Sequence, residues 1–278
     1  MGSPEMKLEN LPATSVIPLS PIGLVACPSI ELISEPLATS CVNTNFLGVA
    51  SYAEKLQEFA GRACYKSFNN KKNSTNREYL KHILDVKHES VLEHAHVSLY
   101  IQGVSRSLTH ELIRHRVANV SQESQRYVDK SDTAFVIPPI FIKYATDNNV
   151  SLASLPIFKE WVLLNQEALD GYNKLVKMAQ DLEIVADSKT TARKRIRESC
   201  RSVLPNDTET SLVFTANLRE WRHIIRLRAS IYADLEIRRL AVMIFDILHN
   251  GFPNNFQDMK LEIAEDGLYH VATISKNV

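Results

Sequence analysis

The sequence has few of the features that mark secreted, membrane-bound or nucleic-acid-binding proteins. Its four cysteines, Cys27, Cys41, Cys64 and Cys200, have neither CxxC nor Cys/His metal spacing, which predicts a cytoplasmic protein in a reducing compartment. No run of about 18 apolar residues could span a membrane, and the first residues lack the pattern of a signal peptide. Lysine plus arginine equal aspartate plus glutamate at 32 each, so we expect neither a nucleic-acid nor a membrane partner.

Several common catalytic motifs are also missing. The chain has no GxGxxG, no GxxxxGK[ST] and no Ser-His-Asp arrangement that its spacing supports. An HExxH zinc motif is absent from "HESVLEH", because His88 and His94 are six residues apart. We interpret this segment as a polar ligand-binding loop and expect no metal; a solvated turn and a metal site are the alternatives.

What the sequence does contain is enough apolar residues for a substantial core. The chain has 278 residues and 45% hydrophobic content, which allows one large domain or two small ones. Residues 1–28 lack a sustained period and are expected to form an extended or partly disordered arm. Periodicity predicts helices over 48–67, 77–86, 104–116, 155–182, 189–201 and 233–249, with another after Asn217. It predicts strands over 29–36, 95–101, 135–142 and 210–217, the third made irregular by prolines.

A second polar cluster is "RHRVANVSQESQR", residues 114–126. Either Arg114 or Arg116 alone could cap the C-terminus of the preceding helix, but two arginines around His115 exceed that need. The small residues that follow, with Ser121, Ser124 and Gln125, can surround a phosphate or a heterocycle, and Arg126 adds a bidentate donor. A solvated cationic loop is the alternative.

A third cluster lies in "ANLREWRHIIRLRAS". If Asn217 is the N-cap, Arg219 lies in the first helical turn, where its charge opposes the helix dipole and indicates an anionic partner. Arg219, Arg222 and Arg226 recur at near-helical spacing with His223; a basic face paired with the chain's own glutamates is the alternative. In the basic run at 189–201, only Arg201 is placed to turn inward. The residues alone predict a soluble protein that binds phosphorylated, nucleotide-like ligands.

Four motifs in order resemble one known family, the flavin-dependent thymidylate synthases. "RHRVANVSQES" is similar to that family's Arg-His-Arg signature, and "HESVLEH" to its His-Glu-x-x-x-Glu-His segment. "CRSVLP" resembles its Arg-x-x-Leu-Pro segment, and "ANLREW" with "LRAS" its Asn-x-Arg and distal arginine segment. The likeness covers about residues 30–250, and "GRACY" at 61–65 adds to it.

The resemblance implies a fold, a reaction and an assembly. It implies the α+β class, with an elongated subunit whose central mixed or antiparallel sheet is flanked by helices. It implies a single catalytic domain over 29–250 between the arm at 1–28 and a tail at 251–278. The implied reaction is reductive C5 methylation of dUMP to dTMP, with FAD as hydride carrier and NADPH and methylenetetrahydrofolate as co-substrates. The implied assembly is a homotetramer with shared active sites.

The resemblance also assigns residues to the site. Those expected to bind FAD are His88, Ser90, Glu93, Arg114, His115, Arg116, Asn217, Arg219 and His223. Those expected to bind the nucleotide are Glu111, Arg114, Glu123, Ser124, Gln125, Arg126, Arg201 and Arg228. The catalytic assignments are Arg228, Ser124 and His88, although Ser124 lacks a visible activating base and is therefore expected to bind rather than attack.

Three positions depart from the family pattern and leave the substrate open. Glu111 lies where many members carry glutamine, Tyr232 where a polar residue or histidine is commoner, and Cys64 where serine is frequent. A relative that methylates UMP or another pyrimidine nucleotide would share the same clusters. The clusters are also compatible with a flavoprotein oxidase or reductase, and with a non-enzymatic nucleotide- or RNA-binding module.

Overall fold

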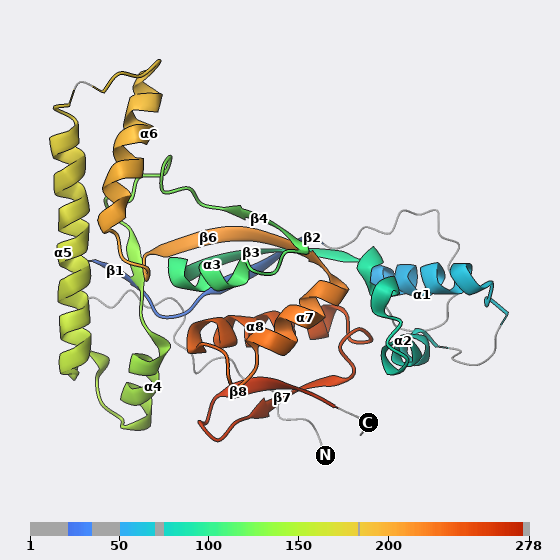
Figure 1. Cartoon of the computed structure of the whole chain (residues 1–278). Helices are drawn as coiled ribbons and strands as arrows, with labels where there is room; N and C mark the ends of the chain where they lie inside the picture. Colours follow the sequence, from blue (N-terminus) through green and yellow to red (C-terminus); the bar gives the residue numbers. More distant parts are fainter. Residues whose placement is uncertain (1–21, 35–50, 70–74, 183, 275–278) are drawn as a thin grey trace. The chain divides into compact units, whose positions relative to one another are not determined.

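The computed structural model describes residues 22–34, 51–69, 75–182 and 184–274 (Figure 1). Helices and strands both occur along this part of the chain, which confirms the predicted α+β class. None of the helices described there combines the length and apolar character that crossing a membrane requires.

The chain divides into two compact units, which are described separately. The first unit comprises Met1–Ser29, Ile101–His110 and Gln122–Leu212, and the second comprises Ile30–Tyr100, Glu111–Ser121 and Val213–Val278. The long strands β3 (His96–Ser105) and β6 (Glu209–Asn217) each contribute several residues to both units. They belong to a four-stranded sheet of order β2-β3-β6-β4, whose other strands are β2 (Ser29–Ser34) and β4 (Ala118–Gln122).

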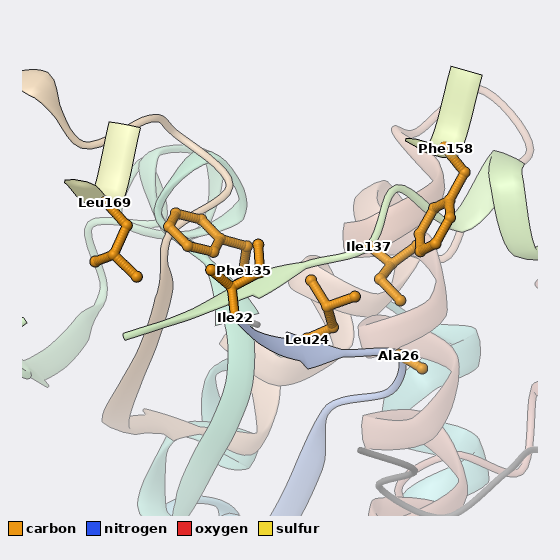
Figure 2. Packing of buried hydrophobic residues seen from close by; sticks show 7 residues of the cluster. All are labelled: Ile22, Leu24, Ala26, Phe135, Ile137, Phe158 and Leu169. Atoms are coloured by element: carbon orange, nitrogen blue, oxygen red, sulfur yellow. The ribbon is translucent and has the colours of Figure 1, made fainter. Parts of the chain in front are cut away.

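The core of the first unit is built on a pair of short parallel strands. Strand β1 (Gly23–Val25) pairs with β5 (Ala134–Val136) so that Leu24 lies opposite Phe135. Their buried side chains pack with Phe158 and Leu169 of helix α5 (Pro156–Ala179), as Figure 2 shows. The described end of the predicted N-terminal arm is thus a buried strand, whereas residues 1–21 lie outside the described residues.

The prediction of one strand over 135–142 was wrong beyond residue 136. Strand β5 ends at Val136, and helix α4 (Pro139–Asp147) begins three residues later. Pro138 is the N-cap of this helix. Proline at the first helical position has a φ suited to a helix and lacks only an N–H that would have no partner in the helix. The second proline therefore starts a helix instead of interrupting a strand.

Long helices complete the first unit. The predicted helix over 155–182 is confirmed as α5, which runs beside α6 (Lys189–Cys200) in Figure 1. A one-turn 3-10 helix, η3 (Leu152–Ser154), precedes α5, and another, η4 (Arg201–Val203), follows α6. The predicted helix over 104–116 is shorter than expected: α3 spans Arg106–Leu112, because Val104 and Ser105 belong to β3.

The second unit contains the two helices predicted over 48–67 and 77–86, and both are capped. Helix α1 (Tyr52–Tyr65) has a capping box of Ser51 and Glu54, and α2 (Asn76–Asp85) has one of Thr75 and Glu78. The two helices approach closely at Gly61, where a Cβ would lie 2.0 Å from the hydroxyl of Tyr79. A side chain at position 61 would therefore have to displace the Tyr79 ring.

Glu54 also holds α1 to a distant segment of the same unit. Its side chain is fully buried and accepts hydrogen bonds from the backbone N–H groups of Ser51 at 3.0 Å, Asn254 at 2.7 Å and Asn255 at 3.3 Å. The Asn254 amide donates to Asn76 Oδ1 at 2.9 Å, which brings α2 into the network. Burial raises the pKa of the Glu54 carboxyl, although these backbone donors act in the opposite direction.

The C-terminal part contains regular structure that the sequence did not predict. Helices α7 (Leu218–Arg228) and α8 (Leu235–Gly251) are followed by an antiparallel hairpin of β7 (Met259–Ile263) and β8 (Tyr269–Thr273). The prediction that α8 is the last regular element was therefore wrong. The overlooked signal is the Asp-Gly turn at 266–267, where Gly267 has a positive φ of 75°.

Candidate functional site

Helix α7 carries the largest group of predicted site residues in the second unit. Asn217 is confirmed as its N-cap, since its side chain accepts a hydrogen bond from the Glu220 N–H at 2.8 Å. Arg219 lies in the first turn and forms an ion pair with Glu93, from the 3-10 helix η2 (Glu89–His94). The "HESVLEH" segment thus forms a short helix whose carboxylates face the arginines of α7.

Glu89 was not among the predicted site residues, yet it lies between two arginines. Its carboxylate is 4.0 Å from Arg219 Nε and 3.5 Å from Arg226 Nη2. These residues border a cavity of about 340 Å³, which we call the acidic cavity. It is lined by Glu89, Glu93, Val117, Asn217, Arg219, Glu220, His223 and Arg226. With three carboxylates and two arginines, it suits a polar ligand without a high negative charge.

Arg222 does not belong to the arginine face on which the sequence spacing placed it. Its side chain is 1% exposed and forms two hydrogen bonds of 2.7 Å to the carboxylate of Asp258. It also donates to the backbone oxygen of Asn255. A buried arginine with a bidentate carboxylate partner is structural, and it holds α7 to the segment before the C-terminal hairpin.

At the C-terminal end of α7, Arg228 is fixed by three hydrogen bonds. Its guanidinium donates to the Glu111 carboxylate at 2.7 Å, to the Glu111 backbone oxygen at 3.1 Å and to His115 Nε2 at 3.1 Å. The family departure at Glu111 therefore has a structural role, because this carboxylate pairs with Arg228. The fork of Arg228 is held in one orientation.

The same contacts determine the protonation of His115. Because Nε2 accepts a hydrogen bond from Arg228, the proton of the neutral ring lies on Nδ1, which is 3.4 Å from Glu220 Oε1. Burial, followed by the charge of Arg228, lowers the pKa of His115 to about 4. Burial also raises the pKa of the Glu220 carboxyl. His115 is therefore neutral at physiological pH.

The side-chain nitrogen and oxygen atoms of His115, Glu220 and His223 that could bind a metal ion lie within 4.8 Å of one another. We therefore compared this group with a metal site. A cation on Nδ1 of His115 would move the ring proton to Nε2, where it would face the N–H donor of Arg228. The arginines around the group also repel a cation. Its donor set is better suited to hydrogen bonding than to metal coordination.

A second cavity, of about 600 Å³, shares His223 and Arg226 with the acidic cavity. We call it the basic cavity; its lining is Arg114, His115, His223, Arg226, Leu227, Arg228, Ser230, Tyr232 and Ala233. Three arginines and no carboxylate line it. Arg226 and Arg228 are paired with Glu89 and Glu111, which lie outside the lining, so the donors that face the cavity are cationic. An anionic ligand fits this cavity.

We expect the neutral state of His115 to make the protein less stable in acid. The folded-state pKa of about 4 is below the ordinary value of 6.5, so between these values the unfolded chain binds the proton more readily. The free energy of unfolding should therefore fall as the pH is lowered from 6.5 towards 4. Urea denaturation of the wild type and of His115→Gln at several pH values tests this. An equal loss of stability in both proteins would contradict it.

The predicted nucleotide loop lies in the first unit and is held by α6. Arg126 Nε is 2.8 Å from Glu198 Oε2, and its backbone N–H donates to Ser124 Oγ at 3.3 Å. Glu123 forms an ion pair with Lys130, whose side chain is buried. Burial and then the nearby charge of Arg201 lower the pKa of Arg106, so the unit also brings two arginines into electrostatic contact.

Other predicted site residues lie outside the two cavities. His88, Ser90 and Arg116 are exposed and contribute to the lining of neither. Four partners of predicted site residues were not assigned to the site from the sequence: Glu89, Lys130, Glu198 and Glu220. Of these, Glu89 belongs to the predicted "HESVLEH" loop, and Glu220 to the glutamates that could pair with the basic helix face. Glu89, Glu198 and Glu220 contact residues far away along the chain, namely Arg219, Arg126 and His115. Lys130 is the exception, since it lies seven residues from Glu123.

The fold and the site define an α+β protein with fixed arginine side chains around a cavity. Residues 47–254 match the family described as "Thymidylate synthase complementing protein". A relative from Mycolicibacterium vanbaalenii is 46% identical over 214 residues, 76% of this chain and 82% of that protein. One from Corynebacterium diphtheriae is 38% identical over 248 residues, covering 88% and 92%. Both are named flavin-dependent thymidylate synthase. The chain belongs to this family, which confirms the resemblance of its motifs.

Proposed function

We propose that this protein methylates C5 of dUMP to form dTMP. Methylenetetrahydrofolate supplies the carbon, NADPH is the reductant and FAD is the hydride carrier. Family membership supports the reaction, and one structural observation supports it most directly: Arg228, fixed by Glu111 and His115, lines a basic cavity together with Arg114. The finer features of the proposal are a fold like that of the family and a catalytic domain over 29–250 in a cytoplasmic homotetramer with shared active sites.

The residues present fit a flavin dinucleotide. Its diphosphate needs cations, which Arg114 and Arg226 of the basic cavity supply, and its polar ring edge needs donors and acceptors, which Asn217, Arg219 and His223 supply. We infer that these residues hold the cofactor, with Glu93 positioning Arg219. When bound, the flavin supplies hydride chemistry that no side chain can perform.

The chain's own residues then bind and polarise the pyrimidine. Arg228 offers a fixed positive charge to the anionic oxygen or nitrogen that develops in the uracil ring during attack through C5. Neutral His115 cannot donate a proton from Nε2, since that nitrogen accepts from Arg228. Its role is therefore to position Arg228. In the first unit, Arg126 and Arg201 are proposed to bind nucleotide phosphate, with Glu123, Ser124 and Gln125 shaping the loop.

The decisive experiment offers dUMP, UMP and dCMP separately, each with NADPH and methylenetetrahydrofolate. We expect a purified protein with visible flavin absorbance and a C5-methylated product from dUMP. If product forms only from UMP, the substrate is a ribonucleotide and the proposed type of reaction still holds. If the flavin-loaded protein methylates none of the three nucleotides, the proposed synthase activity is wrong. If added flavin does not bind to the purified protein, every flavin-dependent function is excluded.

A further inference from the structure

The hairpin of β7 and β8 lies just beyond the part of the chain that matches the family, in the segment that was expected to be a C-terminal tail. The family match ends at residue 254, whereas the two strands and their turn span residues 259–273. Strand β8 contacts both α7 and α8 within the second unit (Figure 1). These contacts connect the hairpin to the lining of the basic cavity.

Two buried arginines hold the hairpin, one at each end. Arg222 of α7 pairs with Asp258, directly before β7, and Arg238 of α8 pairs with Asp266 in the turn. The two arginine side chains are only 1% and 2% exposed. Replacing a buried ion pair by apolar side chains often costs no stability, so the geometry that these pairs fix explains them better than stability does. Here they fix the hairpin against α7 and α8.

Arg238 holds the turn through four hydrogen bonds. Its guanidinium donates to the two carboxylate oxygens of Asp266 at 2.6 and 3.3 Å, to the Leu268 backbone oxygen at 3.0 Å and to the Tyr269 backbone oxygen at 2.9 Å. Asp266 in turn accepts a hydrogen bond from the Leu268 N–H at 2.9 Å. The donors of a guanidinium have fixed directions, so this set of acceptors defines one orientation of the turn. Strand β8 therefore leaves the turn in a defined direction.

The middle of β8 is bonded to the end of α7. The Val271 N–H donates to the Ala229 backbone oxygen at 3.0 Å, and both residues are buried. In an antiparallel pair, residues that bond to the partner strand alternate with residues that do not. Ile274 N–H bonds to the Asp258 backbone oxygen at 2.6 Å, so the even-numbered residues of this strand bond to β7. The N–H of Val271 therefore points away from β7, towards Ala229.

Ala229 begins a loop that lines the basic cavity. It is the C-cap of α7 and directly follows Arg228. The loop residues in the lining are Ser230, Tyr232 and Ala233. Within the loop, Ser230 accepts the Tyr232 N–H on Oγ at 3.3 Å and the Ala233 N–H on its backbone oxygen at 3.1 Å. A loop with these internal bonds moves as one piece, and its first residue is the one that β8 holds.

We propose that the C-terminal hairpin is a positioning element for the basic cavity, in which the Val271 N–H, kept in place by Arg238 at the turn, fixes Ala229 and the loop beside Arg228. The inference rests on the proposed function, because the role of Arg228 in that reaction is what makes its position important. The hairpin acts through the loop and touches no ligand itself. The catalytic domain proposed over 29–250 therefore needs residues beyond its predicted end.

Hydrogen exchange of the loop, measured by mass spectrometry on the full chain, tests the contact itself. Val271→Pro removes the N–H that bonds to Ala229 and breaks no bond between β7 and β8. The matched control is Thr273→Pro, since that exposed residue has its N–H on the same side of β8 and the described part of the chain offers it no acceptor.

We expect the amides of residues 229–234 to exchange about fivefold faster in Val271→Pro, the effect of one net hydrogen bond on a local opening equilibrium. Thr273→Pro should keep the wild-type rate. Equal rates in all three proteins, or the same increase in both variants, would overturn the proposal.

Steady-state kinetics with dUMP test whether the position of the loop matters for the reaction. Val271→Pro should lower kcat by up to about 10²-fold, the loss that a small misplacement away from the chemistry can cause, while its flavin content stays near that of the wild type. Thr273→Pro should keep the wild-type kcat. An unchanged kcat in a variant whose loop exchanges faster would contradict a positioning role.

Arg238→Met is the second variant, and it decides the question if circular dichroism shows that Val271→Pro does not fold. It removes the anchor at the turn and leaves the Val271 N–H in place. We expect faster exchange of the loop and a lower kcat here too; wild-type values of both would overturn the proposal. If the wild type itself methylates no nucleotide, the proposed function fails, whereas the exchange rates still show whether the hairpin holds the loop.

Discussion

Replacing Arg228 with alanine is expected to lower dUMP methylation by about 10²- to 10³-fold, the usual effect of removing one fixed donor that stabilises developing charge. The structure gives the reason: Glu111 and His115 hold the guanidinium in one orientation at the basic cavity. An arginine already oriented loses little freedom when the ring becomes anionic. The loss should therefore affect kcat more than the KM for dUMP.

Steady-state kinetics and flavin absorbance should be measured together for Arg228→Ala and Arg228→Lys. Lysine keeps the charge but cannot make the three directed hydrogen bonds, so we expect only partial recovery of kcat. The flavin content of both variants should stay near that of the wild type. Loss of flavin in proportion to activity would instead assign Arg228 to the cofactor, and unchanged kcat would remove it from the chemistry.

Replacing Glu54 with alanine is expected to lower the free energy of unfolding by about 3 kcal/mol, in the range for breaking a buried hydrogen-bond network. The change leaves the backbone N–H groups of Asn254 and Asn255 buried without their acceptor. It also removes the capping box of α1. Urea denaturation at neutral pH measures the effect, and the neighbouring Lys55→Ala, at a half-buried position outside this network, is the control.

The pH dependence of the same experiment distinguishes the charge of Glu54 from its shape. A raised carboxyl pKa in the folded state means that the folded protein binds the proton more tightly than the unfolded chain. This part of the stability is present below the ordinary value of 4.5 and is lost as the pH rises towards the folded pKa. Glu54→Gln should abolish that decline. A decline that persists in Glu54→Gln would show that other groups cause it.

Periodicity and capping signals were sufficient to predict the elements that depend on local interactions. Helices α1, α5 and α6 and strands β3 and β6 lie where spacing of apolar residues placed them. The errors occurred where local signals compete. The two prolines at 138–139 can end a strand or start a helix, and the C-terminal hairpin has little apolar alternation because β7 and β8 are only partly buried.

The candidate site was less predictable because its contacts connect distant residues. Sequence spacing identified the N-cap Asn217 and the arginine at the first turn of α7, both of which depend on one helix. It could not show that Arg222 turns inward to Asp258, nor that Glu89 lies between Arg219 and Arg226. The spacing of residues along the sequence shows which of them share one face of a helix. Which segment covers that face depends on the packing of the folded chain.

The arginines proposed to bind ligands already have carboxylate partners: Arg126 with Glu198, Arg219 with Glu93 and Arg228 with Glu111. An unrestrained arginine loses about 2 kcal/mol of side-chain entropy when it is fixed, and here part of that loss occurs during folding. The carboxylate occupies only some of the five guanidinium N–H donors and leaves the others for an incoming phosphate or enolate. A chain with no net charge can therefore still discriminate between anions by the direction in which each paired arginine presents its remaining donors.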